Sequence, residues 1–197
     1  MPAENISDVK IGSRACTRAG VGPITSFEDG TAQATVLQDN YDSVVDNALS
    51  LYPWQFARKL VSLGAPLADV QVPQYYDNLY QLPDECFKLW RLDINGTRTT
   101  EYEILGLTVA CYAGNNDTVR ALYTYRADES VWHPTFVEYV VYKLASLLAT
   151  GVAHDAKRAE LFEGQADLQW RRARHAVSIE DTNLEIRSTD FVTTRFV

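Results

Sequence analysis

Apolar residues recur every three or four positions in the first quarter of the chain, the spacing that gathers side chains on one face of a helix. This pattern predicts helices over residues 6–19 and from about Thr31 to Tyr52. Residues 19–30 between them are rich in Gly, Pro, Ser and Asp, which is typical of a loop. Pro53 ends the second helix because proline has no backbone N–H and disfavours helical geometry in the residue before it.

Two large aromatic residues follow this proline at once, in the segment LSLYPWQFARKL. Rings of this kind bury roughly 150 to 250 Å² each when packed. We therefore predict that Pro53, Trp54 and Phe56 form a hinge of the fold, where the helical part joins the next part of the chain. Core packing is the favoured interpretation of the two aromatics, and a ligand-stacking role is the alternative.

The middle third of the chain changes to the pattern of β-strands. Short runs rich in β-branched and aromatic residues are bounded by Gly, Pro and an Asn95-Gly96 turn signal. In one run, strict alternation places Leu89 and Leu92 on opposite faces. The predicted strands cover residues 57–63, 76–82, 87–94, 101–105, 108–112 and 118–126. They form a small, mostly antiparallel sheet or partial barrel inserted between helices.

Helical spacing returns at Pro134, a residue well suited to the first turn of a helix. Another helix is predicted to follow Asp155, which serves as its N-cap. Leu161 and Leu168 lie off the main apolar face of this last helix, so part of it is expected to pack on another subunit.

Together these elements predict an α+β fold: a helical bundle with an inserted small antiparallel β-sheet or partial barrel, followed by an extended C-terminal arm. The expected parts are the N-terminal helices of the bundle (1–56), the β-rich insertion (57–130), the C-terminal helices (131–176) and the arm (177–197). The arm has strand-like composition without a sequential partner, so it either frays or adds itself to another chain.

Composition narrows the class of protein without naming a function. The chain has 197 residues and a net charge of −8, which opposes non-specific attraction to nucleic acid. Its three cysteines are far apart and odd in number, as expected of buried thiols in a reducing compartment. The first residues do not resemble a signal peptide, and no run approaches the roughly 18 to 20 apolar residues that span a bilayer. We expect no membrane partner and production in the cytosol.

The residues that usually carry catalysis are scattered. His133, His154 and His175 have no second histidine or cysteine at metal-ligand spacing. The neighbouring acids Glu28-Asp29, Asp84-Glu85 and Glu101 with Glu103 could supply an acid and a base, but the sequence gives no reason to expect a shifted pKa, so solvated charges are the favoured interpretation. No nucleophile elbow, P-loop or zinc-protease motif is present. We expect no enzyme, metal or cofactor. The remaining enzyme hypothesis is a pocket between sheet and helices lined by three tyrosines, Tyr75, Tyr76 and Tyr80.

One basic cluster lies near the end of the last helix, between Trp170 and His175. Its arginines, Arg171, Arg172 and Arg174, complement the helix dipole in one interpretation. In the other, they contact an acidic partner or DNA phosphates. Because they spread round the helix, at most two of them share one surface.

Four segments in order resemble a known family: TRAGVGPITSFEDGTAQA, LSLYPWQFARK, YDNLYQLPDECFKLWRL and VWHPTFVEYVVYKLASLLA. They are similar to the head-to-tail adaptor proteins of tailed phages, the family of tail tubular protein A, which also has relatives in gene transfer agents. The resemblance covers residues 10–176 and contains no catalytic signature. Its most specific pieces are the run from Pro53 to Ala57 and the run from Tyr80 to Pro83 that precedes Cys86.

The resemblance implies a structural virion protein. Members of this family form a ring between the portal and the tail of a phage or phage-like particle, after production in the bacterial cytoplasm, and leave a channel for DNA. The implied partners are the portal protein, further copies of the chain in a ring matching twelve-fold portal symmetry, and a downstream tail or stopper protein. The alternative is a nucleic-acid-binding module that uses the cluster from Trp170 to His175.

By the same analogy, the C-terminal arm docks on the portal. Phe191, Val192 and Phe196 would be its apolar anchors. We expect a chain that lacks residues 184–197 to fold as a monomer and to fail to join portal-bearing heads.

Overall fold

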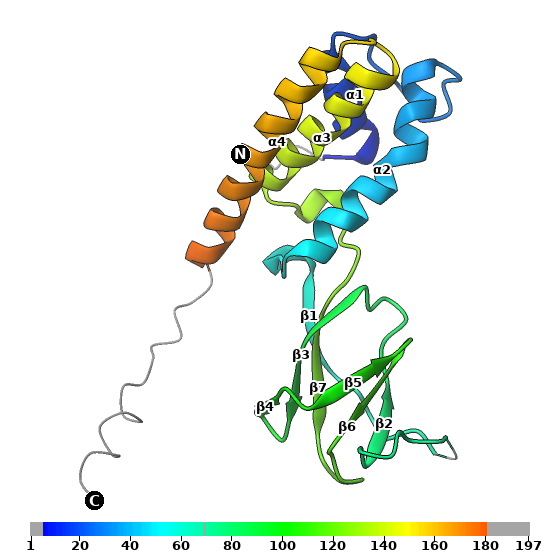
Figure 1. Ribbon diagram of the computed structural model, residues 1–197, viewed down its shortest axis with the longest axis vertical. Coiled ribbons are helices and arrows are strands. Elements are labelled where there is room, and N and C mark those ends of the chain that lie inside the picture. Colours follow the sequence, from blue (N-terminus) through cyan, green and yellow to red (C-terminus); the bar gives the residue numbers. More distant parts are fainter. Residues whose placement is uncertain (1–5, 69, 181–197) are drawn as a thin grey trace, which may run out of the picture.

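The computed structural model describes residues 6–68 and 70–180, which form a helical unit and a β unit at opposite ends of an elongated molecule (Figure 1). The helices are α1 (Asp8–Ala19), α2 (Ala32–Leu51), α3 (Pro134–Gly151) and α4 (Ala156–Glu180). The strands are β1 (Arg58–Ser62), β2 (Asn78–Gln81), β3 (Lys88–Ile94), β4 (Thr97–Thr99), β5 (Tyr102–Leu105), β6 (Thr108–Cys111) and β7 (Val119–Thr124). The predicted α+β fold with a β-rich insertion is confirmed, and the strands form two small antiparallel sheets without a closed barrel.

Side-chain caps fix the helix ends at the positions that the sequence indicated. Thr31 Oγ1 accepts a hydrogen bond from the backbone N–H of Ala34 at 3.3 Å and starts α2. Asp155 Oδ1 accepts one from the N–H of Arg158 at 3.0 Å and starts α4. Such caps satisfy backbone N–H groups that have no partner inside the helix.

The last helix is longer than predicted. The extended arm was expected from residue 177, but α4 continues to Glu180. No glycine or proline interrupts the sequence after Ala176, and the side chain of Val177 is 1% exposed in the core of the helical unit. Burial of this valine favours one more turn of helix over an extended segment.

The core of the helical unit is centred on α3, which lies between α2 and α4 and also packs against α1. Phe136, Leu144 and Leu148 of α3 are fully buried there. Leu37 and Val45 of α2 meet them from one side. Because α3 packs against three other helices, most of its surface is apolar.

The β unit has its own core between two sheets, with strand orders β1-β7-β3-β4 and β2-β6-β5. Tyr80, Leu92 and Tyr123 are fully buried between them. The prediction that Leu89 and Leu92 lie on opposite faces is wrong. A β-bulge at Trp90 shifts the pairing of β3 with β7, so both leucines are buried in this core.

The chain passes between the units twice, once through a short 3₁₀-helix, η1 (Gln55–Ala57), and once through residues 125–133, which contain η2 (Glu129–Val131). The two passages are hydrogen-bonded, because the N–H of Tyr125 donates to the carbonyl of Ala57 at 2.9 Å. Lys88 Nζ at the start of β3 donates to the carbonyl of Ser50 near the end of α2 at 2.8 Å. Polar contacts thus orient one unit on the other.

Candidate functional site

The aromatic residues of the predicted hinge form a packed cluster in the helical unit. Trp54 is fully buried, with its ring centroid 4.9 Å from that of Phe136 and 5.1 Å from that of Trp170. Its indole Nε1–H donates to the carbonyl of Ala48 at 2.9 Å. Half-buried Phe56 stacks at 5.9 Å from Trp54. The interpretation as core residues is confirmed for Trp54, whose ring has no face open to a ligand.

A basic hollow lies beside this cluster, where the end of α4 passes the end of α2. It has a volume of about 320 Å³ and is lined by five residues, Tyr52, Arg171, Arg174, His175 and Ser178. The guanidinium carbon of Arg174 lies 5.3 Å from the ring centroid of Tyr52. Arg172 is exposed but does not line the hollow. Two of the three arginines therefore share one surface, in agreement with the limit that the helical spacing set.

We define the basic end as Arg171, Arg172, Arg174 and His175, near the C-terminal end of α4. None of the four makes an ion pair within residues 6–68 and 70–180. Because α4 continues to Glu180, the three arginines lie more than one turn from its end. The helix dipole acts mainly within the last turn, so it accounts for little of this clustering.

An acidic surface occupies another helix and was not predicted as a site. Asp39, Asp42 and Asp46 are spaced on one face of α2, which contains no lysine or arginine. We call these three residues the acidic face. Their spacing of three and four positions was the signal available in the sequence. Acidic residues on an exposed helix face are common, however, and nothing in the sequence pointed to Arg126 as their partner.

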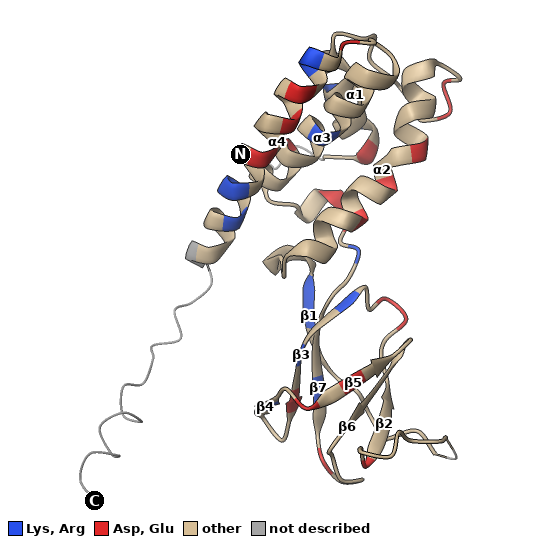
Figure 2. Cartoon of the chain, in the orientation of Figure 1, with Lys and Arg blue, Asp and Glu red and all other residues tan. Residues whose placement is uncertain are grey.

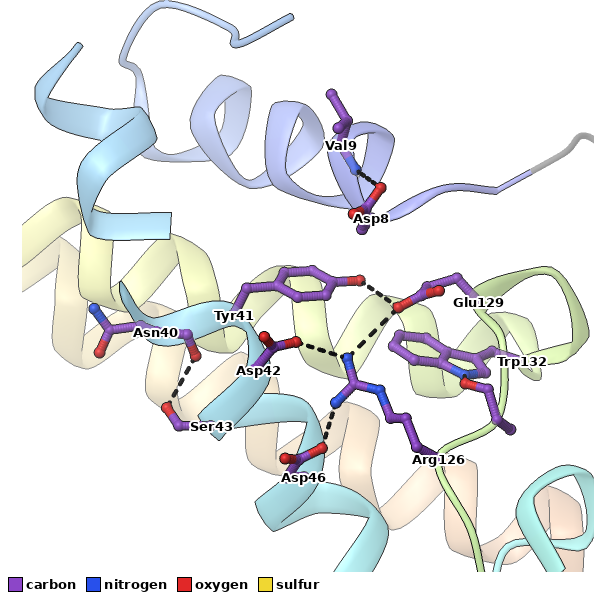
Figure 3. A network of polar contacts seen from close by, with 11 residues as sticks. Asp8, Val9, Asn40, Tyr41, Asp42, Ser43, Asp46, Arg126, Glu129 and Trp132 are labelled. Carbon is purple, nitrogen blue, oxygen red and sulfur yellow. Dashed lines mark hydrogen bonds and ion pairs between the residues drawn. The ribbon is translucent and has the colours of Figure 1, made fainter. Parts of the chain in front are cut away.

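Arg126, on the passage that returns from the β unit, binds part of this acidic face (Figure 3). Its Nη2 lies 3.1 Å from Asp42 Oδ1 and 3.7 Å from Glu129 Oε1, and its Nη1 pairs with Asp46. Tyr41 Oη donates to Glu129 Oε1 at 3.2 Å. Burial, and next the charge of Glu129, raises the pKa of the Tyr41 hydroxyl. The network ties α2 to the second passage between the units.

Among the described residues, two thiols and one carboxylate have shifted pKa values that bear on catalysis. Burial raises the pKa of the Cys16 and Cys111 thiols to about 11, so both are protonated at neutral pH and weak as nucleophiles. A hydrogen bond from Tyr123 and another from Lys59 lower the pKa of Glu85, whereas a general acid needs a raised one. The part of the chain that the structure describes holds no cluster of three or more His, Cys, Asp or Glu residues suited to a metal.

The three tyrosines of the enzyme hypothesis do not line one pocket. Tyr80 is fully buried in the core of the β unit. Tyr75 is 75% exposed on its surface, and the ring of Tyr76 lies 5.2 Å from that of Tyr112. The proposed arrangement is therefore wrong, because one of these side chains faces the core and another faces solvent.

Apolar side chains are exposed at both ends of the molecule. Leu161 and Leu168 of α4 are 59% and 44% exposed, in agreement with their predicted place off the main apolar face. A second group surrounds the hairpin of β5 and β6 and consists of Ile104, Leu105, Leu107 and Tyr112. Large contiguous apolar patches are typical of interaction surfaces, whereas single exposed apolar residues are normal on a protein surface.

The residues assigned to portal docking, Phe191, Val192 and Phe196, lie outside the described residues. Within the described range, no helix has the length and apolar character needed to cross a bilayer. The sequence matches no protein-family model and no curated protein.

Proposed function

We propose that this chain is a structural head-to-tail adaptor of a phage or gene transfer agent, one copy in a ring between portal and tail. The observation that carries the proposal is the order of the four segments that resemble this family. They occupy the α1–α2 loop, the hinge after α2, the path from β2 to β3, and α3. These are two joints of the fold, the path between its two sheets and its central helix, so the resemblance involves both units.

The surface of the molecule supports a role carried out through interfaces. Exposed apolar side chains at the β5–β6 hairpin and on α4 give the chain two separate surfaces for neighbours. The buried thiols and the Glu85 carboxylate lack the ionisation of a catalytic site. The proposed partners are the portal protein, other copies of the chain in twelve-fold symmetry, and a tail or stopper protein. Phe191, Val192 and Phe196 are the proposed portal anchors.

DNA crosses the proposed ring without being held by it. A net charge of −8 per copy repels DNA phosphates, and a channel that bound DNA tightly would slow its passage. The proposed place of action is the neck of the particle, after production in the bacterial cytoplasm.

Joining to heads tests the proposal directly. Purified protein is mixed with DNA-filled, tailless heads from the same source and examined by pull-down and negative-stain microscopy. A ring of density at the portal vertex is the expected result. Folded protein that leaves the vertex bare overturns the adaptor role.

Deleting residues 184–197 tests the assignment of the arm. The shortened chain is expected to keep its helical circular dichroism and to lose joining to heads. Joining at the level of the full chain overturns the assignment of Phe191, Val192 and Phe196.

A second candidate function, a nucleic-acid-binding module, is favoured by the two arginines that line the basic hollow. Two phosphate contacts give a weak salt dependence, with a slope of about −2 in log K against log salt. Titration of duplex DNA at low and moderate salt distinguishes the two functions. DNA binding that weakens as the salt concentration rises favours the module, and no binding at moderate salt favours the adaptor.

A further inference from the structure

Opposite charges are exposed on opposite sides of the helical unit. In Figure 2 the basic end is blue on the lower half of α4, at the left, and the acidic face is red along α2, at the right. The helix α3 lies between α2 and α4, so the basic end and the acidic face of one copy do not neutralise each other. Among the described residues, the three arginines and both Asp39 and Asp42 are exposed.

The basic end is shaped to receive carboxylates. The stretch from Leu168 to Ser178 holds three arginines and no acid. Leu168, one turn before Arg171 and Arg172, is 44% exposed and adds an apolar contact beside the charges. A surface with cations beside an exposed leucine fits a protein partner better than a phosphate backbone, which offers no apolar group to the leucine.

The acidic face already binds one guanidinium group and has room for more. Asp42 pairs with Arg126, yet its side chain stays 83% exposed. Asp39 is exposed and makes no ion pair among the described residues. Figure 3 shows that Asp42 and Asp46 approach Arg126 from one side of α2. Arginines from outside therefore meet carboxylates that are accessible and only partly neutralised.

We propose that the basic end of one copy docks on the acidic face of the next copy. Because two different surfaces on opposite sides of the unit meet, the contact is head-to-tail, the type that closes a ring when the rotation between copies permits. The inference rests on the proposed function, since it assigns the subunit contact of the proposed ring. Charge complementarity fixes which surfaces meet, because two basic ends or two acidic faces repel each other.

Two charge-reversal variants test this contact. Arg171→Glu with Arg174→Glu makes the basic end acidic, and Asp39→Lys with Asp42→Lys makes the acidic face basic. Arg126 keeps Asp46 and Glu129 in the second variant, so the junction between the units remains paired. Each variant alone is expected to lose at least about tenfold in self-association at low salt. An equimolar mixture is expected to associate again, because each reversed surface then finds its complement.

The matched control reverses the same number of exposed arginines in the β unit, by Arg98→Glu with Arg120→Glu. It has the same net charge as the first variant and is expected to associate as the wild type does. Association is measured as the mean mass by sedimentation, and melting curves verify the folding of each variant. Unchanged association in both test variants, or a mixture that fails to restore it, overturns the proposal.

Cross-linking decides the case of a free protein that is monomeric at equilibrium. Asp42→Cys and Arg174→Cys are introduced together in a Cys86→Ser background, and a short bis-maleimide is added. Because each copy then carries both sides of the contact, a ladder of dimers, trimers and larger products is expected. The Cys86→Ser parent, whose remaining thiols are buried, controls for other reactions. A chain that yields no ladder overturns the contact.

Joining to tailless heads, measured on the same variants, separates this inference from the proposed function. If self-association is lost in each variant and restored in the mixture, but the wild-type protein does not join heads, the contact is supported and the adaptor role is overturned. Joining and self-association that both survive the reversals overturn the contact alone. Loss of DNA binding with unchanged self-association in the arginine variant assigns the basic end to DNA and overturns the contact.

Discussion

The helical unit and the β unit each bury apolar side chains in a core of their own. The helical core joins aliphatic residues from four helices to a chain of aromatic rings around Trp54 and Phe136. The β core is smaller and lies between two short sheets, with Tyr80 and Tyr123 as its largest side chains. Among the described residues, Tyr125 is the one side chain packed against both cores.

The contrast between the cores and their junction explains how the molecule is held together. Each core is apolar, whereas the junction is held mainly by polar contacts, namely the backbone hydrogen bond from Tyr125 to Ala57, the Arg126 network and the Lys88 contact with Ser50, with the Tyr125 ring as its apolar part. Burial of a large side chain contributes several times more than one exposed ion pair. We infer that each unit is more stable internally than its attachment to the other, and four predictions test this ranking.

The largest effect is expected from Trp54→Ala in the helical unit. Loss of a fully buried indole that contacts several rings should lower the free energy of unfolding by about 3–5 kcal/mol, as measured by urea denaturation. Trp54→Phe keeps a ring but loses the hydrogen bond to Ala48, so a smaller loss is expected. A Trp54→Ala protein that unfolds at the urea concentration of the wild type contradicts the hinge interpretation.

A smaller and more local effect is expected from Leu92→Ala in the β unit. This fully buried leucine lies on β3, and its truncation should lower the free energy of unfolding by about 2–4 kcal/mol. Hydrogen exchange should accelerate in β3 and β7 while α3 stays protected, because the cores are separate. Leu60→Ala, at a position 47% exposed on β1, is the control and should change stability little. Equal acceleration in α3 would show that the two cores unfold together.

The sequence predicted the order of the helices and of six of the seven strands that the structure describes, because periodicity, caps and turns act locally; the short strand β4 was not predicted. Pro134, Asp155 and Asn95-Gly96 each fix the backbone through their immediate neighbours, and all lie where expected. The bulge at Trp90 depends on pairing with β7, about thirty residues away, so alternation within β3 gave the wrong face for one leucine.

The site was harder to predict than the fold for the same reason. The helical spacing of the three arginines predicted that at most two of them share a surface. It did not indicate that these two are Arg171 and Arg174, or that Tyr52 from another helix lies beside them. The partnership of Arg126 with Asp42 joins residues 84 positions apart. Contacts of that separation follow from the packing of the two passages between the units, which no local pattern encodes.

At the junction, Arg126→Gln should have a modest effect on stability. The substitution leaves Asp42, Asp46 and Glu129 without their shared cation. Because these ion pairs are partly exposed, the free energy of unfolding should fall by only about 1 kcal/mol. The β unit should exchange faster relative to α3, and high salt should reduce the difference between variant and wild type. Lys143→Gln, which removes a pair between α3 and α4 inside one unit, is the control. If the control changes the relative exchange of the units equally, Arg126 does not couple them.

The smallest effect is expected from acid, within the β unit. Glu85 accepts hydrogen bonds from Tyr123 Oη at 2.6 Å and from Lys59 Nζ at 2.9 Å, and these lower its pKa below the usual value. A carboxylate with a lowered pKa in the folded state adds stability above its unfolded pKa and loses it as the pH falls through the folded value. Its side chain is 46% exposed, so solvent screens much of this gain.

Tyr123→Phe removes the hydroxyl that makes the larger contribution to this shift. The melting temperature of the wild type should therefore fall more steeply between about pH 5 and about pH 3 than that of the variant. Glu85→Gln, which does not titrate, should show the shallowest fall. Curves of equal slope for all three proteins would mean that acid lowers stability through carboxylates other than Glu85. The hydrogen bonds to Glu85 would then add no measurable pH dependence to the stability of the β unit.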